Sequence, residues 1–217
     1  MIENPVWNGL LGAHAPLAQR HGRAAAYDPA VSQFGALESG DPAAWDDLRA
    51  LLGPRRVAVL LDADVPAGFR ILHEVVVHRM VARSWEPQPD ADVIDLGPND
   101  VPEMLDLTRR TKPGPFEPRT IEMGRYAGIR VDGRLVAMAG ERMHPPGFTE
   151  VSAVCTDPEF TGRGFARRAM GVIGAGILGR GETPFLHVAV GNPARALYER
   201  LGFVVVRDLP VRAVLPV

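Results

Sequence analysis

The stretch VCTDPEFTGRGFARRAM, residues 154–170, places three small residues where an apolar strand passes into a helix. Gly162, Gly164 and Ala166 carry little or no side chain, so another molecule can approach their backbone closely. The first turn of a helix also has unpaired N–H groups and the positive end of the helix dipole. Taken alone, this pattern fits either a tight turn or a seat for a phosphate group.

A second stretch, NPARALYERLGF at residues 192–203, adds a proton donor. It has the pattern of a helix with Asn192 as N-cap and Gly202 just past its end. Helical spacing puts Leu197 on the packed face of this helix and Tyr198 at the edge of that face. A phenol at this position can donate a proton to a departing group, or it can serve only to pack.

Apolar periodicity and turn residues predict the elements that hold these two stretches. The clearest is a hairpin at residues 126–141, where Asp132 and Gly133 supply a type I′ turn. A helix over residues 99–111 is expected to be capped by Asn99 or Asp100. The other strands are expected at 92–96, 148–155, 184–190, 203–209 and 211–215, and the other helices at 164–178 and 192–202.

The first 90 residues predict a separate, mixed α/β unit. The segment RSWEPQPDAD, residues 83–92, has two prolines and several polar residues and is typical of a linker. We therefore expect two units, residues 1–90 and residues 91–217. Within the first unit, strands are expected at 24–29, 56–62 and 71–82, with a helix over 41–53 that Asp41 caps.

With the order of elements in place, residues 92–217 resemble the GNAT superfamily of acyl-CoA-dependent N-acyltransferases. The segment VCTDPEFTGRGFA is similar to its pyrophosphate-binding motif, Arg/Gln-x-x-Gly-x-Gly/Ala, and NPARALYERLGF is similar to its second signature. Two motifs at the right spacing are more specific than either motif alone. Thr161 departs from the pattern, because the family usually has Arg or Gln there.

The resemblance implies an α/β fold with a mixed, mostly antiparallel central sheet, splayed strands and flanking helices. Residues 1–90 would add an α/β unit that is a candidate degenerate copy of the same architecture. No glycine loop joins a strand to a helix in that unit. We therefore expect one coenzyme A site in the chain.

The resemblance also implies which residues bind coenzyme A. Backbone amides of residues 161–166 would hold its pyrophosphate, and the strand before them would pair with the pantetheine arm where it splays from the strand at 184–190. Tyr198 would protonate the departing thiolate, whereas Cys155 is expected to pack, because no base is committed to it. The expected cofactor-binding residues are Val154, Cys155, Thr156, Thr161, Gly162, Arg163, Gly164, Phe165, Ala166, Asn192, Ala194 and Tyr198.

The base that removes the proton from the amine is open at this level. Glu150, on the strand before the loop, is the first candidate, followed by Glu141, His187 and water. His73 and His78 are five residues apart on a strand and face opposite sides, so we expect no metal site.

These features indicate an enzyme that transfers an acetyl group from acetyl-CoA directly to an amine. The alternative is a non-catalytic module that binds acyl-CoA, since a fold alone does not establish turnover. The acceptor is open among a polyamine, an amino acid, a peptide N-terminus and an antibiotic. Residues 109–120, Phe116 and Phe148 are expected near it.

Composition argues against several other classes of protein. The net charge of −2 and the lack of a basic stripe disfavour nucleic-acid binding. No apolar run approaches the length of a membrane span, and the N-terminus lacks a signal-peptide pattern. The single cysteine rules out an intrachain disulfide and fits a cytoplasmic protein, and a homodimer is compatible with the sequence.

Overall fold

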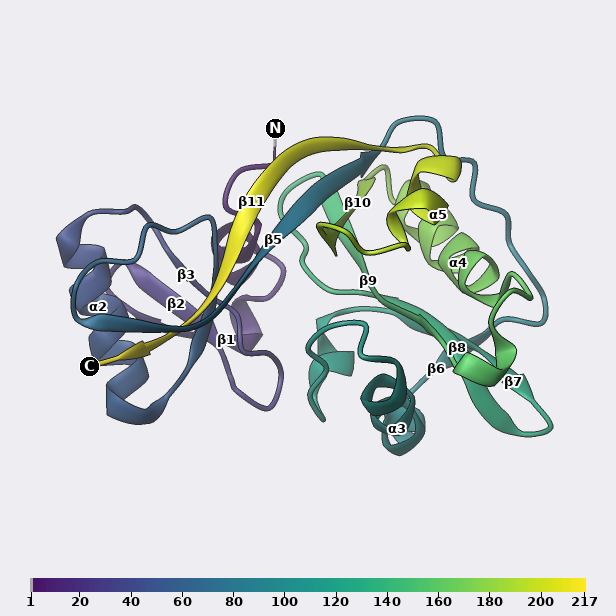
Figure 1. Ribbon diagram of the computed structural model, residues 1–217, viewed down its shortest axis with the longest axis horizontal. Coiled ribbons are helices and arrows are strands. Elements are labelled where there is room, and N and C mark those ends of the chain that lie inside the picture. The colour runs from purple at the N-terminus through teal and green to yellow at the C-terminus, as the bar shows by residue number, and fades with distance from the viewer. Residues whose placement is uncertain (1) are drawn as a thin grey trace.

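A continuous eight-stranded sheet is the centre of the computed structural model, which describes residues 2–217 (Figure 1). Neighbouring strands run antiparallel except β9 and β10, which pair in parallel. This mixed, mostly antiparallel sheet with flanking helices confirms the predicted fold class. In order across the sheet the strands are β4 (Ala58–Leu61), β11 (Phe203–Pro216), β5 (Phe69–Ala82), β10 (Thr183–Ala189), β9 (Phe148–Thr156), β8 (Arg134–Glu141), β7 (Tyr126–Val131) and β6 (Ile94–Leu96).

Two helices cover opposite faces of the sheet around β8. Helix α3 (Val101–Thr111) packs with Met138, whereas helix α4 (Phe165–Gly179) packs with Ala137 and Ala139. These β8 residues alternate, as a strand buried on both faces requires. No helix within residues 2–217 is long and apolar enough to cross a membrane.

The N-terminal part adds a small three-stranded antiparallel sheet of β1 (Ala18–His21), β2 (Ala24–Tyr27) and β3 (Gly35–Leu37). Helix α2 (Pro42–Leu52) begins as predicted, because the Asp41 side chain accepts a hydrogen bond from Ala44 N at 2.9 Å. Local patterns in the sequence do not predict β1, β3 or helix α1 (Pro5–Leu11). Each is short and shows too few residues of a periodic pattern to be identified.

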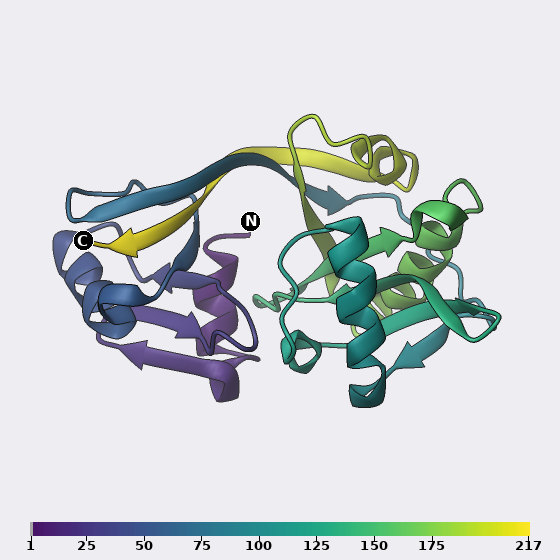
Figure 2. The ribbon, with the colours of Figure 1, turned by 60° about the horizontal axis from the view of Figure 1, so that its bottom comes forward.

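Two long strands join this N-terminal part to the rest of the molecule (Figure 2). β5 lies between β10 and β11, and β11 lies between β5 and β4, so the sheet crosses the boundary expected at residue 90. His14 adds a buried contact across the same boundary, since its ring nitrogens bond to Tyr27 Oη and Met123 O, both at 2.8 Å. Whether residues 1–90 and 91–217 fold as separate units stays a prediction.

Two expected elements differ from the prediction. The strands expected at 203–209 and 211–215 are the single strand β11, because Pro210 lies just before the residues that pair with β4, where a missing N–H is tolerated. The helix expected from residue 192 begins later, as α5 (Arg195–Arg200). Asn192 Oδ1 accepts from Ala194 N at 2.9 Å and so closes a turn ahead of the helix.

Two glycines of α4 face the linker between the two expected units. A methyl group on Gly171 would lie 2.7 Å from Gln88 O, and one on Gly174 would collide with the indole ring of Trp85. Trp85 is itself buried against Phe203, with ring centroids 5.0 Å apart. The linker is therefore packed on α4, and the small residues of the helix make this close approach possible.

Replacing Gly174 with alanine therefore forces Trp85 out of its place. We expect Gly174→Ala to lower the free energy of unfolding by about 1–3 kcal/mol, the usual cost of overpacking. The control is Gly179→Ala in the same helix, where a methyl group meets nothing within 4 Å and stability is unchanged or slightly raised. Urea unfolding followed by tryptophan fluorescence measures both, and equal stability of the two variants would contradict this packing.

Candidate active site

The two parallel strands β9 and β10 part soon after they meet. They pair only from Phe148–Glu150 to Thr183–Phe185, and beyond Glu150 the two strands separate. Ala153 has φ 52, a left-handed conformation that is rare for a residue with a side chain, at a register shift between β8 and β9. The splayed strands expected from the sequence are present, and the free edge of β9 faces the opening.

A cavity of about 540 Å³ occupies this opening. One wall comes from the splayed strands and α5, and the other comes from β4, β5, β11 and Phe34. Residues 111–115, at the end of α3 and just after it, complete the lining. The cavity thus brings together residues from both ends of the chain. Of the residues predicted from the sequence, it is lined by residues 111–115 of the segment expected near the acceptor, but not by Phe116 or Phe148. It is also lined by Val154, Cys155, Thr156, His187, Asn192, Ala194 and Tyr198.

Tyr198 presents a protonated phenol to this cavity. Its side chain is buried, and its hydroxyl makes no hydrogen bond with any residue in the described range 2–217. Burial raises the pKa of Tyr198 to about 12, so the proton stays on the oxygen at neutral pH. Cys155 is close by, and burial raises the pKa of its thiol to about 11, so it is a neutral packing residue rather than a thiolate.

The small-residue loop lies at the entrance to α4, outside the 540 Å³ cavity. Gly162 and Gly164 have φ 78 and φ 76, and a methyl group on either would meet nothing within 4 Å. Gly164 is the N-cap of α4 and offers no side chain to its first N–H groups. The rest of the loop lies over the start of the helix and is open to solvent. Thr161 and Arg163 are exposed, and Phe165 and Ala166 are half-buried.

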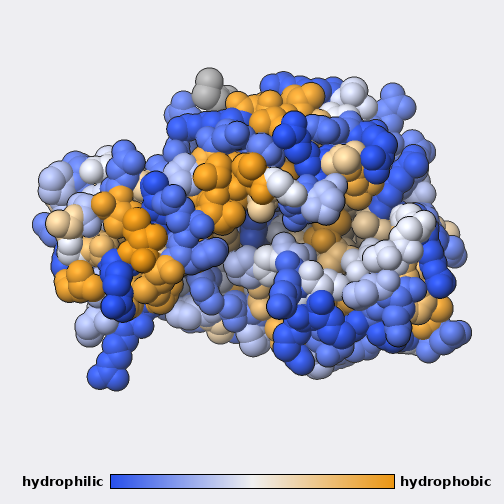
Figure 3. Space-filling view, in the orientation of Figure 1, coloured by the Kyte–Doolittle hydropathy of each residue, from blue (hydrophilic) through white to orange (hydrophobic). Residues whose placement is uncertain are grey.

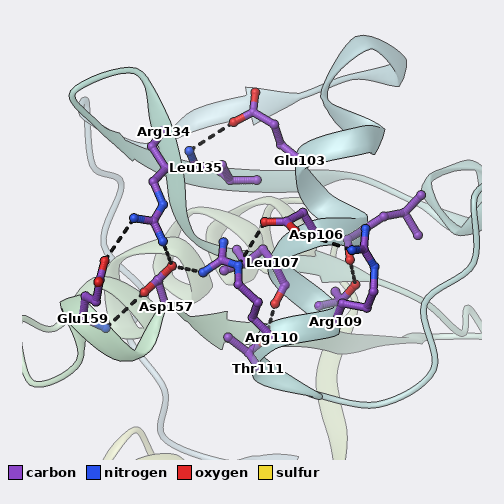
Figure 4. A network of polar contacts seen from close by, with 12 residues as sticks. Glu103, Asp106, Leu107, Arg109, Arg110, Thr111, Arg134, Leu135, Asp157 and Glu159 are labelled. Atoms are coloured by element: carbon purple, nitrogen blue, oxygen red, sulfur yellow. Dashed lines mark hydrogen bonds and ion pairs between the residues drawn. The ribbon is translucent and has the colours of Figure 1, made fainter.

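A buried carboxylate fixes the segment that leads into this loop. Asp157 follows β9 directly and is 1% exposed, with ion pairs to Arg110 of α3 and Arg134 of β8 (Figure 4). Its other oxygen accepts from Glu159 N at 3.0 Å. Two arginines from different elements therefore anchor the start of the loop to the sheet and to α3.

Glu150 lies behind the cavity rather than in its wall. The side chain is fully buried, and both carboxylate oxygens accept hydrogen bonds from Arg142, at 2.7 and 2.8 Å. Burial alone would raise the pKa of this carboxyl, but the charge and hydrogen bonds of Arg142 and His187 outweigh burial and hold the pKa below its usual range. A carboxylate held in this way is a poor proton acceptor.

The other two candidate bases are also occupied. His187 donates from Nδ1 to Glu150 at 2.8 Å and accepts at Nε2 from Arg79 Nε at 3.1 Å, which fixes a neutral ring with its lone pair in use. Burial lowers the pKa of His187, although Glu150 opposes this. Glu141 is buried and paired with Arg180 at 3.0 Å, away from the cavity.

Several cavity residues were not singled out by the sequence analysis as part of the site. Arg142 can be found from the sequence, because it directly follows β8 and is close in sequence to Glu150 on the next strand, β9. In the structure its backbone N–H donates to Glu150 O at 3.0 Å. Phe34, Val59 and His73 have none, because long-range pairing brings them to the site: β5 carries His73, and β4, which pairs with β11, carries Val59 and its bridge partner Phe34.

Comparisons with known proteins support this geometry. A family model described as FR47-like protein matches residues 126–209. A solved GNAT-family protein from Novosphingobium aromaticivorans DSM 12444 is 38% identical, with a TM-score of 0.90, and the alignment covers 99% of this chain and 97% of that chain.

Two more distant solved structures share the fold. A GCN5-related N-acetyltransferase from Kribbella flavida is 19% identical with a TM-score of 0.63, and the alignment covers 100% of this chain and 97% of that chain. A GCN5-related N-acetyltransferase-like protein from Streptococcus suis 89/1591 is 16% identical with a TM-score of 0.61, over 99% and 93% of the two chains. No curated protein matches the chain.

Removing the charge of Glu150 leaves buried guanidinium groups without a carboxylate. We expect Glu150→Gln to lower the free energy of unfolding at pH 7 by about 3–5 kcal/mol, as for other broken buried ion pairs. The control is Glu199→Gln, which breaks an exposed pair with Arg195 and changes stability by less than about 1 kcal/mol.

The pH dependence of the difference gives a second check. Because the pKa of Glu150 is lower in the folded than in the unfolded state, its contribution is complete above about pH 4.3, the ordinary Glu value. It is lost as the pH falls through the folded pKa. Urea unfolding at pH 7 and at acid pH measures this, and a difference between wild type and Glu150→Gln that is constant down to the acid limit would contradict the assignment.

Proposed function

The chain belongs to the GNAT family of acetyltransferases, and on this premise we propose that it transfers the acetyl group of acetyl-CoA directly to an amine. The observation that carries the proposal is the cavity between β9 and β10, which combines an unpaired strand edge with the free phenol of Tyr198. A direct transfer needs both substrates in one cavity at once, and this cavity is built from two walls.

The chain has groups that match each part of acetyl-CoA. Cys155 and Thr156 pair with β8 on one side only, and Val154 lies beside them at the register shift, so the other edge of this segment is free to bond to the amide groups of the pantetheine arm. The loop before α4 offers amides and the positive end of a helix to the pyrophosphate. Arg163 and Arg167 lie beside it, and neither forms an ion pair with a residue in the described part of the chain.

Acetyl-CoA supplies a thioester, and the chain supplies position and a proton. The neutral amine nitrogen bonds to the thioester carbonyl carbon as the carbon–sulfur bond breaks. The sulfur leaves with the electron pair and takes the phenol proton of Tyr198, which its high pKa keeps available. The products are the N-acetylated amine and coenzyme A, and the phenolate left on Tyr198 takes a proton back from water.

The proton that the amine must lose has no carboxylate to receive it in the cavity wall, within residues 2–217. We assign this proton to water in the open cavity. Glu150, the first candidate from the sequence, becomes a positioning residue in this proposal, because it holds His187 and Arg142 at the point where the strands part.

The loop before α4 should control cofactor affinity. Gly164→Glu puts a negative charge at the phosphate seat, and we expect acetyl-CoA binding to weaken at least tenfold, about 1.4 kcal/mol. The control is Gly181→Glu, because Gly181 lies just past the other end of α4 with nearly the same φ, 74, and equally open space. Calorimetry on both folded variants measures the effect, and equal affinities would remove the loop from the cofactor site.

The phenol of Tyr198 should act on turnover and not on binding. Tyr198→Phe keeps the ring and removes the donor, so thiol release with an amine acceptor should fall by roughly 10²-fold while acetyl-CoA affinity stays the same. The control is Tyr126→Phe, which removes a buried hydroxyl that has no hydrogen-bond partner in the described chain. Undiminished turnover in Tyr198→Phe would exclude it as the proton donor, and binding of acetyl-CoA without thiol release for any amine would favour the non-catalytic module.

A further inference from the structure

The lining of the active-site cavity carries basic groups and, within residues 2–217, no aspartate or glutamate. The basic side chains are Lys112 and Arg142, together with the imidazoles of His73 and His187. An acceptor with several positive charges would meet only like charges or neutral groups here. A polyamine or a polycationic antibiotic needs carboxylates that this wall does not offer; a polyamine and an antibiotic were both open from the sequence.

Lys112 is the only lysine in the chain, and it lies at the rim of the cavity. It follows α3 in a left-handed conformation, with φ 50 and ψ 53, a position that favours glycine. Its ammonium group forms no ion pair with any residue in the range 2–217, whereas Arg109 and Arg110 nearby pair with Asp106. The chain thus holds a free positive charge at the cavity in a strained position.

A second excess of positive charge is buried behind the cavity. Arg79 is 5% exposed and has no carboxylate within 4 Å among the described residues. Its hydrogen bonds go instead to His187 and to Ile2 O. Burial lowers the pKa of Arg79, and Glu150, which pairs directly with Arg142, opposes this only from a distance, together with Asp62. Uncompensated buried charge is costly, so this arrangement favours an anion in the neighbouring cavity.

The remaining wall of the cavity is apolar. Alternate residues of β5, Val75 and Val77, and of β11, Val211 and Ala213, face inward beside Phe34. Leu72 and Val76, on the other face of β5, are exposed, and Figure 3 shows apolar residues on the outer side of the molecule as well. The inward face nevertheless presents these apolar side chains, with the imidazole of His73, to the cavity that Tyr198 also lines.

We propose that the acceptor is an α-amino acid with an apolar side chain. Its carboxylate binds to Lys112 at the rim in the field of the buried arginines, its side chain packs on the valines of β5 and β11, and its amine faces the free edge of β9. This inference rests on the proposed function and names the acceptor for it: the products are the N-acetylamino acid and coenzyme A, and the amine proton passes to water.

The test compares leucine, leucinamide and spermidine as acceptors for the wild-type protein with acetyl-CoA. Leucinamide has an amide in place of the carboxylate of leucine. Its amine is also less basic, so a larger fraction of it is neutral and able to react at neutral pH. A preference for leucine would therefore appear in spite of this advantage of leucinamide. We expect kcat/KM for leucine to exceed that for leucinamide at least tenfold, with no product from spermidine. Leucinamide or spermidine reacting as well as leucine overturns the inference. No thiol release with any of the three also overturns it, and thiol release with a different amine would then leave the proposed function standing.

A variant isolates the role of Lys112 as a binding residue. We expect Lys112→Gln to raise KM for leucine about tenfold while KM for leucinamide and the affinity for acetyl-CoA stay the same, and Lys112→Arg to restore binding of leucine. Arg109→Gln is the control, because Arg109 is three residues earlier, exposed and outside the cavity. Equal changes for leucine and leucinamide in Lys112→Gln would show that Lys112 does not bind the carboxylate.

Discussion

The buried ion pair between Glu150 and Arg142 is the constraint on which the site depends. Glu150 is the last residue of β9 that pairs with β10, so its carboxylate lies where the two strands part. Through His187 it also holds β10, and through Arg79 the same cluster reaches β5. A buried carboxylate is stable only with its partners in place. The opening between the strands is therefore fixed in position by the charge cluster at its base.

The cavity has two walls with different origins. The wall that carries Tyr198 and the free edge of β9 belongs to the segment that the FR47-like model matches, residues 126–209. The opposite wall includes Phe34, Val59 and His73, which lie outside that segment. In such an arrangement the chemistry of acyl transfer and the choice of acceptor can vary independently, because different parts of the chain supply them.

The sequence predicts the local features well and the long-range ones poorly. The hairpin at 126–141 and the helix over residues 164–178 follow from turn residues and apolar spacing, and both are present. Glu150 was a reasonable base by position alone. Its burial and its bonds to Arg142 and His187 depend on pairing across three elements, which no local pattern encodes. The insertion of β5 between β10 and β11 was missed for the same reason.

The place of β11 in the sheet also has a consequence for the order of assembly during synthesis. β4 has no other neighbour in the eight-stranded sheet, so it waits for a strand more than 140 residues further along the chain. β5 can join β10 earlier, but β11 must then enter between β4 and β5 rather than add at an edge. Contacts so far apart in sequence form slowly. On the ribosome the edges of β4 and β5 that pair with β11 stay open until β11 emerges, which makes this the stage at which the nascent chain has most need of a chaperone.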